Sequence, residues 1–218
     1  MYRWLSTGTV KSVDGRVADM SGTTTSGVDL VGDETTLNIA RAALLASLTG
    51  AFAIVGSIPI PFSPIPFTLQ VLGVFLAGLL LGPVWGAASM LLYLVAGAVG
   101  APVFAGGAAG IGVLAGQSGG YLFSYPIAAA ATGYIAHGGL EPTDLRTVSS
   151  LRPLAGMTVA IVIIYALGTA QFAFVNDIGF VEALTLASLP FIPGDVLKMF
   201  VALIIIQSGS LNEHVLPK

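Results

Sequence analysis

The sequence Phe191-Ile192-Pro193-Gly194-Asp195-Val196-Leu197-Lys198 joins a charged pair to the apolar run of residues 199–206. Pro193 suits the first turn of a helix, where its missing N–H costs little, so a hydrophobic helix is expected to begin here. Residues three apart share a helix face, which makes Asp195 and Lys198 neighbours. Two interpretations are open at this point. The pair is a functional site inside a membrane, or an interfacial anchor in which Lys198 reaches the headgroups and Asp195 caps the helix.

The composition is that of an integral membrane protein. Hydrophobic residues make up 55% of the 218 residues, charged residues only 9%, and the mean hydropathy is +0.91. Soluble domains carry about 25% charged residues. Cysteine is absent, which excludes disulfides and cysteine metal sites, and no metal centre is expected. The net charge of −3 argues against a nucleic-acid partner.

Six apolar segments follow a polar N-terminal stretch. They cover residues 37–56, 68–81, 84–97, 121–137, 154–175 and 193–209. A membrane-spanning helix needs about 20 apolar residues. The second and third segments are short and are joined only by Gly82-Pro83, which predicts a tight antiparallel pair. We therefore predict an all-α integral membrane protein with six transmembrane helices over residues 36–210, flanked by polar tails at residues 1–35 and 211–218.

Three connections between these segments are apolar but differ from ordinary loops. Residues 57–67 contain four prolines, residues 101–120 contain seven glycines between positions 106 and 120, and residues 180–189 form a third apolar connector. Irregular backbone at membrane depth survives only where protein buries it or a cavity hydrates it. The three connections are therefore candidate walls of a cavity.

The positive charges predict the orientation. Lysine and arginine occur in the N-terminal stretch, at the start of the first segment, between the fourth and fifth segments and at the C-terminus, but not in the three apolar connections. The positive-inside rule then places both termini in the cytoplasm. The three connections and the Asp195–Lys198 end of the last helix would all face outside, which favours a ligand site over an interfacial anchor.

The sequence offers little for catalysis and more for binding. Its two histidines, His137 and His214, are far apart, and it has no H-E-x-x-H, G-x-S-x-G or P-loop motif, so we expect no enzyme. A buried ligand site needs an apolar wall and a few convergent polar groups. The wall candidates are Phe62, Phe67, Phe104, Tyr121 and Phe191, and the polar candidates are Gln70, Gln117, Ser118, Tyr121, Asp195 and Lys198.

The first segment carries a stripe of small residues, namely Ala42, Ala43, Ala46, Ser47 and Gly50. Small residues four apart let another helix approach closely. The stripe could dock a partner or pack inside this alanine-rich chain, and the spacing alone favours internal packing.

Four motifs resemble the BioY family in kind and order. They are Pro64-Ile65-Pro66-Phe67-Thr68-Leu69-Gln70, Leu81-Gly82-Pro83, Gly106-Gly107 with the later Gly119-Gly120-Tyr121, and Ile192-Pro193-Gly194-Asp195-Val196-Leu197-Lys198. BioY proteins are biotin-specific S components of energy-coupling factor (ECF) transporters. The resemblance covers residues 37 to 209 and agrees with a six-helix bundle whose termini are cytoplasmic.

The resemblance implies a high-affinity biotin-capture subunit in the plasma membrane. Its partners would be a membrane T subunit and two ATPase subunits, which alone use ATP, so the chain needs no cofactor of its own. The family's Asp and Lys, which contact the bound biotin, match Asp195 and Lys198, and its Gly-Gly-Tyr element matches Gly119, Gly120 and Tyr121. With Gln70, Gly106 and Gly107 these residues form the predicted substrate-binding set, although from the residues alone Gln70 is equally a hydrogen-bond partner of another helix and Tyr121 an interface-belt residue. The family's alanine motif, which docks the T subunit, matches Ala42 and Ala46. With this resemblance, docking of a partner becomes the preferred interpretation of the small-residue stripe, in place of internal packing.

The sequence departs from the family at two places in the glycine-rich connection. Gly116-Gln117-Ser118 stands where Gly-Pro-(Ser/Thr) is frequent, and Ala108 and Ala109 stand where some members carry an asparagine. An S component for another vitamin remains an alternative, because a fold does not fix its substrate. A membrane-embedded enzyme is a second alternative.

Overall fold

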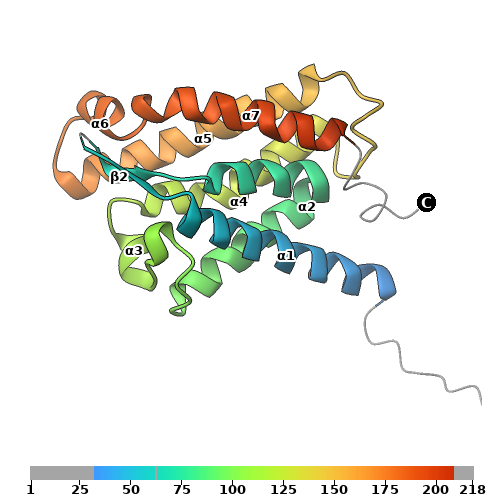
Figure 1. Ribbon diagram of the computed structural model, residues 1–218, viewed down its shortest axis with the longest axis horizontal. Helices are drawn as coiled ribbons and strands as arrows, with labels where there is room; N and C mark the ends of the chain where they lie inside the picture. The colour runs from blue at the N-terminus through green and yellow to red at the C-terminus, as the bar shows by residue number, and fades with distance from the viewer. Residues whose placement is uncertain (1–31, 62, 209–218) are drawn as a thin grey trace, which may run out of the picture. The chain divides into compact units, whose positions relative to one another are not determined.

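The computed structural model describes residues 32–61 and 63–208 (Figure 1). Its elements are α1 (Asp33–Val55), β1 (Ile58–Ile60), β2 (Ser63–Phe67), α2 (Gln70–Ala98), the 3-10 turn η1 (Ala105–Gly107), α3 (Ile111–Ala115), α4 (Gly119–His137), α5 (Leu151–Asn176), α6 (Phe180–Ala187), the 3-10 turn η2 (Leu189–Phe191) and α7 (Ile192–Gln207). Most of the predicted N-terminal tail and all of the predicted C-terminal tail lie outside the described residues. Residues 33–35, predicted as tail, belong to α1.

α2 consists of two helical arms folded back on each other. Gly82 is non-helical, with φ 74° and ψ −176°, and Pro83 follows it at the start of the second arm, where proline is favoured. At the far end of the arms, the side-chain amide of Gln70 donates to the hydroxyl of Tyr93 over 2.5 Å. A straight helix would separate these two residues by about 35 Å. The tight antiparallel pair predicted from Gly82-Pro83 is confirmed.

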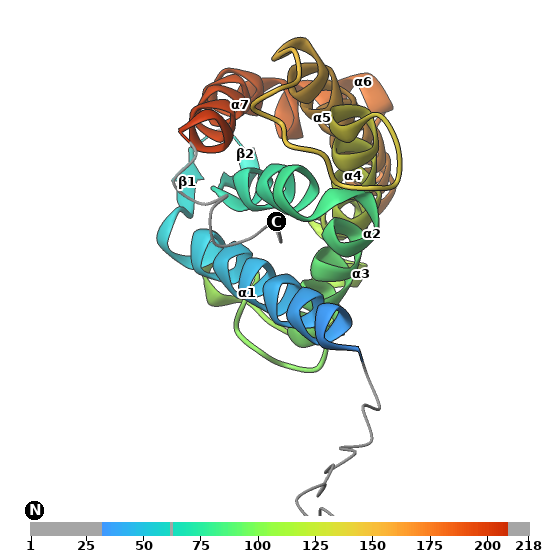
Figure 2. The same cartoon turned by 90° about the vertical axis from the view of Figure 1, so that its right-hand side faces the viewer.

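The helices pack around α4, which lies between α2 and α5 (Figure 2). α1 packs on α2, and α7 contacts both α2 and α5. The outer faces expose many large apolar side chains, among them Leu44, Phe174 and Phe200. Soluble monomers rarely expose contiguous apolar surface on this scale, so these faces suit contact with lipid.

Four helical stretches of the described chain are long and apolar enough to cross a membrane: residues 34–55, 70–98, 151–176 and 180–207. The second is the bent α2, and the fourth runs through α6, η2 and α7. Each of the six predicted apolar segments is helical over nearly all its length. The mostly helical fold class is confirmed, while the number of spans and the location of the termini remain predictions.

The proline-rich connection forms a two-stranded antiparallel hairpin and not irregular backbone. Ile58 pairs with Phe67, and Ile60 pairs with Ser63, with an irregularity between the two pairs. Both strands of a two-stranded ribbon are edge strands, where proline is tolerated because one side of each strand needs no hydrogen-bond donor. The four prolines exclude a helix here but not a strand.

Most of residues 180–189, predicted as a third apolar connector, instead form a short helix, α6. Residues 180–187 contain neither proline nor glycine, so nothing in their backbone opposes a helix. Ala183 and Ala187, four residues apart, form its buried face. Pro190 follows shortly after, and residues before proline disfavour the helical conformation.

The three connections lie at one end of the helices. In Figure 1 the β-hairpin, α3 and α6 lie towards the left, and the loop between α4 and α5 lies with the end of α7 at the right. There Gln207 Nε2 donates to Ser150 Oγ over 2.8 Å, which joins the end of α7 to the start of α5. The end with the connections holds the cavity described next.

Candidate functional site

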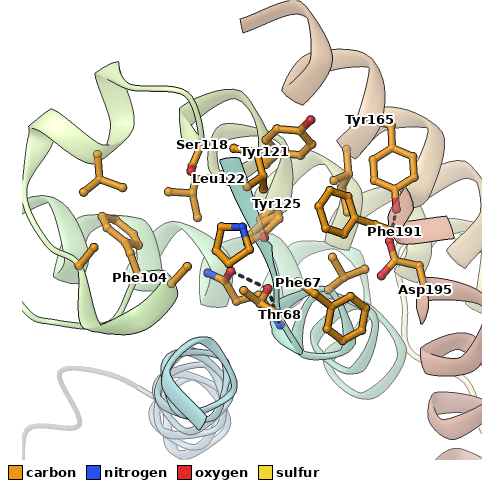
Figure 3. A pocket seen from close by; sticks show the side chains of 18 of the residues that line it. Phe67, Thr68, Phe104, Ser118, Tyr121, Leu122, Tyr125, Tyr165, Phe191 and Asp195 are labelled. Carbon is orange, nitrogen blue, oxygen red and sulfur yellow. Dashed lines mark hydrogen bonds between the residues drawn. The ribbon is translucent and has the colours of Figure 1, made fainter. Parts of the chain in front are cut away.

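A cavity of about 160 Å³ opens between β2, η1, the first turns of α2, α4 and α7, and the middle of α5 (Figure 3). The glycine-rich connection adds Ala105 and Ala108. Two of the three predicted walls, residues 57–67 and 101–120, contribute to the lining. The third prediction is wrong, because none of residues 180–189 lines the cavity and only the segment after them reaches it, through Phe191, Asp195 and Lys198. The aromatic candidates Phe67, Phe104 and Phe191 line it, whereas Phe62 lies outside the described residues.

Asp195 and Lys198 form a buried ion pair in this cavity. Lys198 Nζ lies 2.6 Å from Asp195 Oδ1, and the two side chains are 6% and 3% exposed. The other carboxylate oxygen, Oδ2, accepts a hydrogen bond of 2.5 Å from the hydroxyl of Tyr165 on α5. The ammonium also lies 4.1 Å from the centre of the Phe67 ring, a cation–π contact. The interfacial-anchor interpretation is wrong, because both charged side chains face the cavity.

Gln70 lines the cavity, but most of its amide is already engaged. Its Nε2 donates to the Tyr93 hydroxyl, and its Oε1 accepts from Thr68 Oγ1 over 2.8 Å. The Tyr93 hydroxyl in turn donates to the carbonyl of Val103 over 2.9 Å. Gln70 therefore ties both arms of α2 to the glycine-rich connection, and one amide N–H remains for a ligand.

Tyr121 lines the cavity, but its hydroxyl is engaged elsewhere. Its hydroxyl donates to the carbonyl of Ala187 over 2.6 Å and lies 3.1 Å from Ser188 Oγ. Ser188 also contacts Thr169 Oγ1 at 2.7 Å. The phenol thus fixes the junction between α6 and η2 and does not point a free hydroxyl at a ligand.

Gly119 and Gly120 do not line the cavity. A Cβ on Gly119 would collide with the carbonyl oxygen of Leu114, and one on Gly120 with that of Leu167. These glycines therefore allow close packing of α4 against α3 and α5. The structure supports a scaffold role for them more than direct contact with a ligand.

Gly106 and Gly107 are also absent from the wall. Their φ angles of 67° and 82° make the turn of η1, which places Ala105 and Ala108 on the cavity.

Of the two further polar candidates, Ser118 lines the cavity, whereas Gln117 donates to Asn176 Oδ1 over 2.7 Å and is not in the lining.

Ala42 and Ala46 pack inside the chain. Their exposed fractions are 4% and 7%, and the carbonyl of Ala42 accepts a hydrogen bond of 2.8 Å from Ser89 Oγ on α2. Ser47, on the other face of α1, is exposed. This is the internal packing that the spacing alone favoured, and the burial does not support the partner-binding role predicted for the two methyl groups.

Two tyrosines of the cavity, Tyr165 and Tyr125, are not among the predicted site residues. Tyr165 lies within the apolar run of α5, where no local pattern indicates its partner on α7. Tyr125 lies four residues after Tyr121, so helical spacing could have placed both on one face. The ring of Tyr125 stacks on Tyr93 with centroids 6.4 Å apart, and no hydrogen bond to its hydroxyl is found among the described residues.

The described residues contain no group of three histidine, cysteine or acidic side chains that could hold a metal ion. The cavity instead combines one cation, one carboxylate, several hydroxyl groups and an aromatic wall. Such a site suits a small neutral or monoanionic ligand with polar groups at its ends and an apolar body.

Comparisons with known proteins agree on one family. The family model described as the BioY family matches residues 22–213. The biotin transporter BioY of Rhizobium etli is 36% identical over 84% of this chain and 97% of its own length. The probable biotin transporter BioY of Pyrococcus horikoshii is 39% identical over 78% of this chain and 93% of its own. A crystal structure of the S-component for biotin from an ECF-type ABC transporter superposes with a TM-score of 0.73 at 25% identity, covering 82% and 93% of the two chains.

Proposed function

The chain belongs to the BioY family, and from this premise we propose that it is the biotin-binding S component of an ECF-type vitamin transporter. It is a membrane protein that captures biotin and delivers it for import, and it is not an enzyme. The similarity to biotin transporters extends over most of the chain, and the family match over residues 22–213 includes the helices that build the cavity. The fold shared with a biotin S-component supports the same function.

The observation that carries the proposal is the buried Asp195–Lys198 pair beside an aromatic wall. Biotin has a cyclic urea with two N–H donors and one carbonyl acceptor, an apolar thioether ring and a chain that ends in a carboxylate. A carboxylate accepts from the urea N–H groups, while an ammonium donates to the urea carbonyl or to the terminal carboxylate. Phe67, Phe104 and Phe191 supply apolar surface for the rings.

The proposed contacts follow from what lines the cavity. Asp195 and Lys198 bind the polar groups of biotin, the ring of Tyr121 and the remaining N–H of Gln70 complete the site, and the side chain of Ser118 offers another hydroxyl. Gly106, Gly107, Gly119 and Gly120 shape the site through the backbone. We assign the mouth of the cavity to the outside of the cell, an orientation that the positive-inside rule supports.

Import requires partners. The proposed assembly contains a membrane T subunit and two ATPase subunits in the plasma membrane, and ATP is hydrolysed only by those partners. The absence of a P-loop motif from this sequence supports that division. The superposed protein is itself an S-component of an ECF-type ABC transporter, which is consistent with such an assembly.

Native mass spectrometry of the detergent-purified protein tests the function directly. We expect a stoichiometric biotin adduct that survives purification or forms on addition of biotin, and no adduct with thiamine or riboflavin at the same concentration. Binding of another vitamin in place of biotin would contradict the substrate. Conversion of biotin to a product by the purified chain would favour the membrane-enzyme alternative.

A further inference from the structure

The carboxylate of Asp195 is held by two donors from two different helices. Oδ1 accepts from Lys198, one turn along α7. Oδ2 accepts from the Tyr165 hydroxyl on α5 (Figure 3). The pair Asp195–Lys198 is local to α7, so by itself it does not fix the carboxylate relative to the rest of the cavity. The hydroxyl of Tyr165 is the contact that joins this carboxylate to α5.

The two donors differ in how easily a ligand can replace them. The ammonium of Lys198 has three N–H donors, of which one points to Asp195, and its other described neighbour is the face of the Phe67 ring. It can therefore turn one N–H towards a ligand acceptor and keep its contact with the carboxylate. Tyr165 has a single O–H donor, and Oδ2 uses it. We therefore expect a ligand N–H to donate to Oδ1, because the Lys198 ammonium on that side can turn to make room for it.

We propose that Tyr165 is a positioning residue for biotin binding: it holds Oδ2 of Asp195 so that the carboxylate presents Oδ1 to the urea N–H of the ligand. This inference rests on the proposed function. Without the hydroxyl, the carboxylate is free to turn about its Cβ–Cγ bond and to share both oxygens with Lys198. The ligand would then meet a carboxylate whose oxygens are no longer held in one orientation.

Tyr121 provides a matched control. Its ring also lines the cavity, and it is buried to a similar extent, with 7% exposure against 9% for Tyr165. Its hydroxyl, however, donates to the backbone carbonyl of Ala187 and not to Asp195. Removing either hydroxyl deletes buried hydrogen bonding by a residue that lines the same cavity, to Ala187 and Ser188 in the case of Tyr121, but only Tyr165→Phe removes a donor from the carboxylate of Asp195.

A double-mutant cycle on biotin affinity tests the inference. Hydrogen bonds to charged groups are among the stronger ones, so we expect Tyr165→Phe to weaken binding about tenfold or more in the wild-type background. In the Asp195→Ala background the same substitution should change affinity by less than about twofold, because the acceptor that the hydroxyl positions is gone. Tyr121→Phe should change affinity by the same factor in both backgrounds.

Ligand selectivity gives a second readout that needs only the single variant. Biotin methylated on its urea nitrogens lacks the N–H that the carboxylate accepts, so the wild-type protein should prefer biotin to this analogue. Tyr165→Phe should reduce that preference at least severalfold. A purely structural defect would weaken both ligands equally and leave the preference unchanged.

The outcomes separate this inference from the proposed function. A wild-type protein that does not bind biotin overturns both. Suppose instead that the wild-type protein binds biotin. An equal loss of affinity from Tyr165→Phe in the two backgrounds would then overturn only the role of Tyr165. An unchanged preference for biotin over its methylated analogue would do the same. If Tyr165→Phe is not recovered folded in detergent, its biotin binding is measured in membrane vesicles without purification and is read against the same two criteria.

Discussion

Gln70 and Tyr93, 23 residues apart in the chain, are joined by a hydrogen bond of 2.5 Å across the two arms of α2. The Tyr93 ring also meets Phe104 edge-on at 5.6 Å between centroids. Gln70 thus links the two arms at the end away from Gly82, and its side chain also lines the cavity. It is a structural member of the site as well as a candidate ligand contact.

Replacement of Gln70 by leucine should destabilise the protein more clearly than it impairs ligand recognition. It removes the acceptor of the Thr68 hydroxyl, and a buried donor without a partner costs about 1–3 kcal/mol. The Tyr93 hydroxyl loses the donor from Gln70 but still donates to the carbonyl of Val103. We expect a lower unfolding temperature in detergent and a loss of biotin affinity smaller than that caused by Asp195→Asn. A variant with wild-type thermal stability but no detectable binding would instead identify Gln70 as a principal ligand contact.

Much of this fold is visible in the sequence because its strongest signals are local. Hydrophobic segments are local in the chain, and Gly82-Pro83 between two of them encodes the fold-back of α2 directly. The contact between Asp195 and Lys198 also follows from helical spacing, because residues three apart share a helix face. Each of these signals depends on residues within a few positions of one another, and the structure agrees with all three.

The parts that the sequence did not reveal depend on contacts between distant segments. Whether Ala42 faces a partner or α2 depends on how α1 is rotated about its axis, which spacing does not fix. Tyr165 meets Asp195 across 30 residues, so no motif within either helix contains the pair. The glycines at 119 and 120 occur in a family motif, but their packing against neighbouring backbone becomes apparent only when α3, α4 and α5 are placed together.

Ala46→Trp should destabilise the fold, because the methyl group of Ala46 is buried inside the chain. Overpacking of a well-packed interior typically costs about 1–3 kcal/mol. Ser47→Trp is the matched control, since Ser47 is adjacent on the same helix but exposed. Thermal unfolding in detergent should show a clear loss for Ala46→Trp and little change for Ser47→Trp. Equal unfolding temperatures for Ala46→Trp and the wild type would argue that this face of α1 is open to a partner.

The predicted orientation can be tested by single-cysteine labelling, because the chain has no native cysteine. Ala109, in the connection before α3, and Ser149, before α5, are both exposed and lie in connections assigned to opposite sides. We expect an impermeant maleimide to label Ala109→Cys in intact cells and Ser149→Cys only after permeabilisation. The reverse pattern would invert the topology and place the cavity mouth in the cytoplasm.

The charged pair itself supports the most direct prediction. Asp195→Asn and Lys198→Ala should each weaken biotin binding far more than they lower protein stability. Removal of one partner of a buried, hydrogen-bonded charge pair at a binding site costs about 2–5 kcal/mol, much of it from the charge left unpaired. At about 1.4 kcal/mol per tenfold, this corresponds to a loss of roughly 30-fold to several thousand-fold in affinity.

A substitution on the outer face of α7 separates this effect from a general disturbance of the helix. Leu197 lies between the two charged residues in sequence but is 65% exposed, so Leu197→Ala should leave biotin affinity nearly unchanged. Biotin affinity and the unfolding temperature are measured for all three variants in the same detergent. If Asp195→Asn and Lys198→Ala both stay within about threefold of the wild-type affinity, a difference under about 1 kcal/mol, the buried pair does not bind the ligand. The pair would then only help to keep α7 in place, and other residues of the cavity would have to bind biotin.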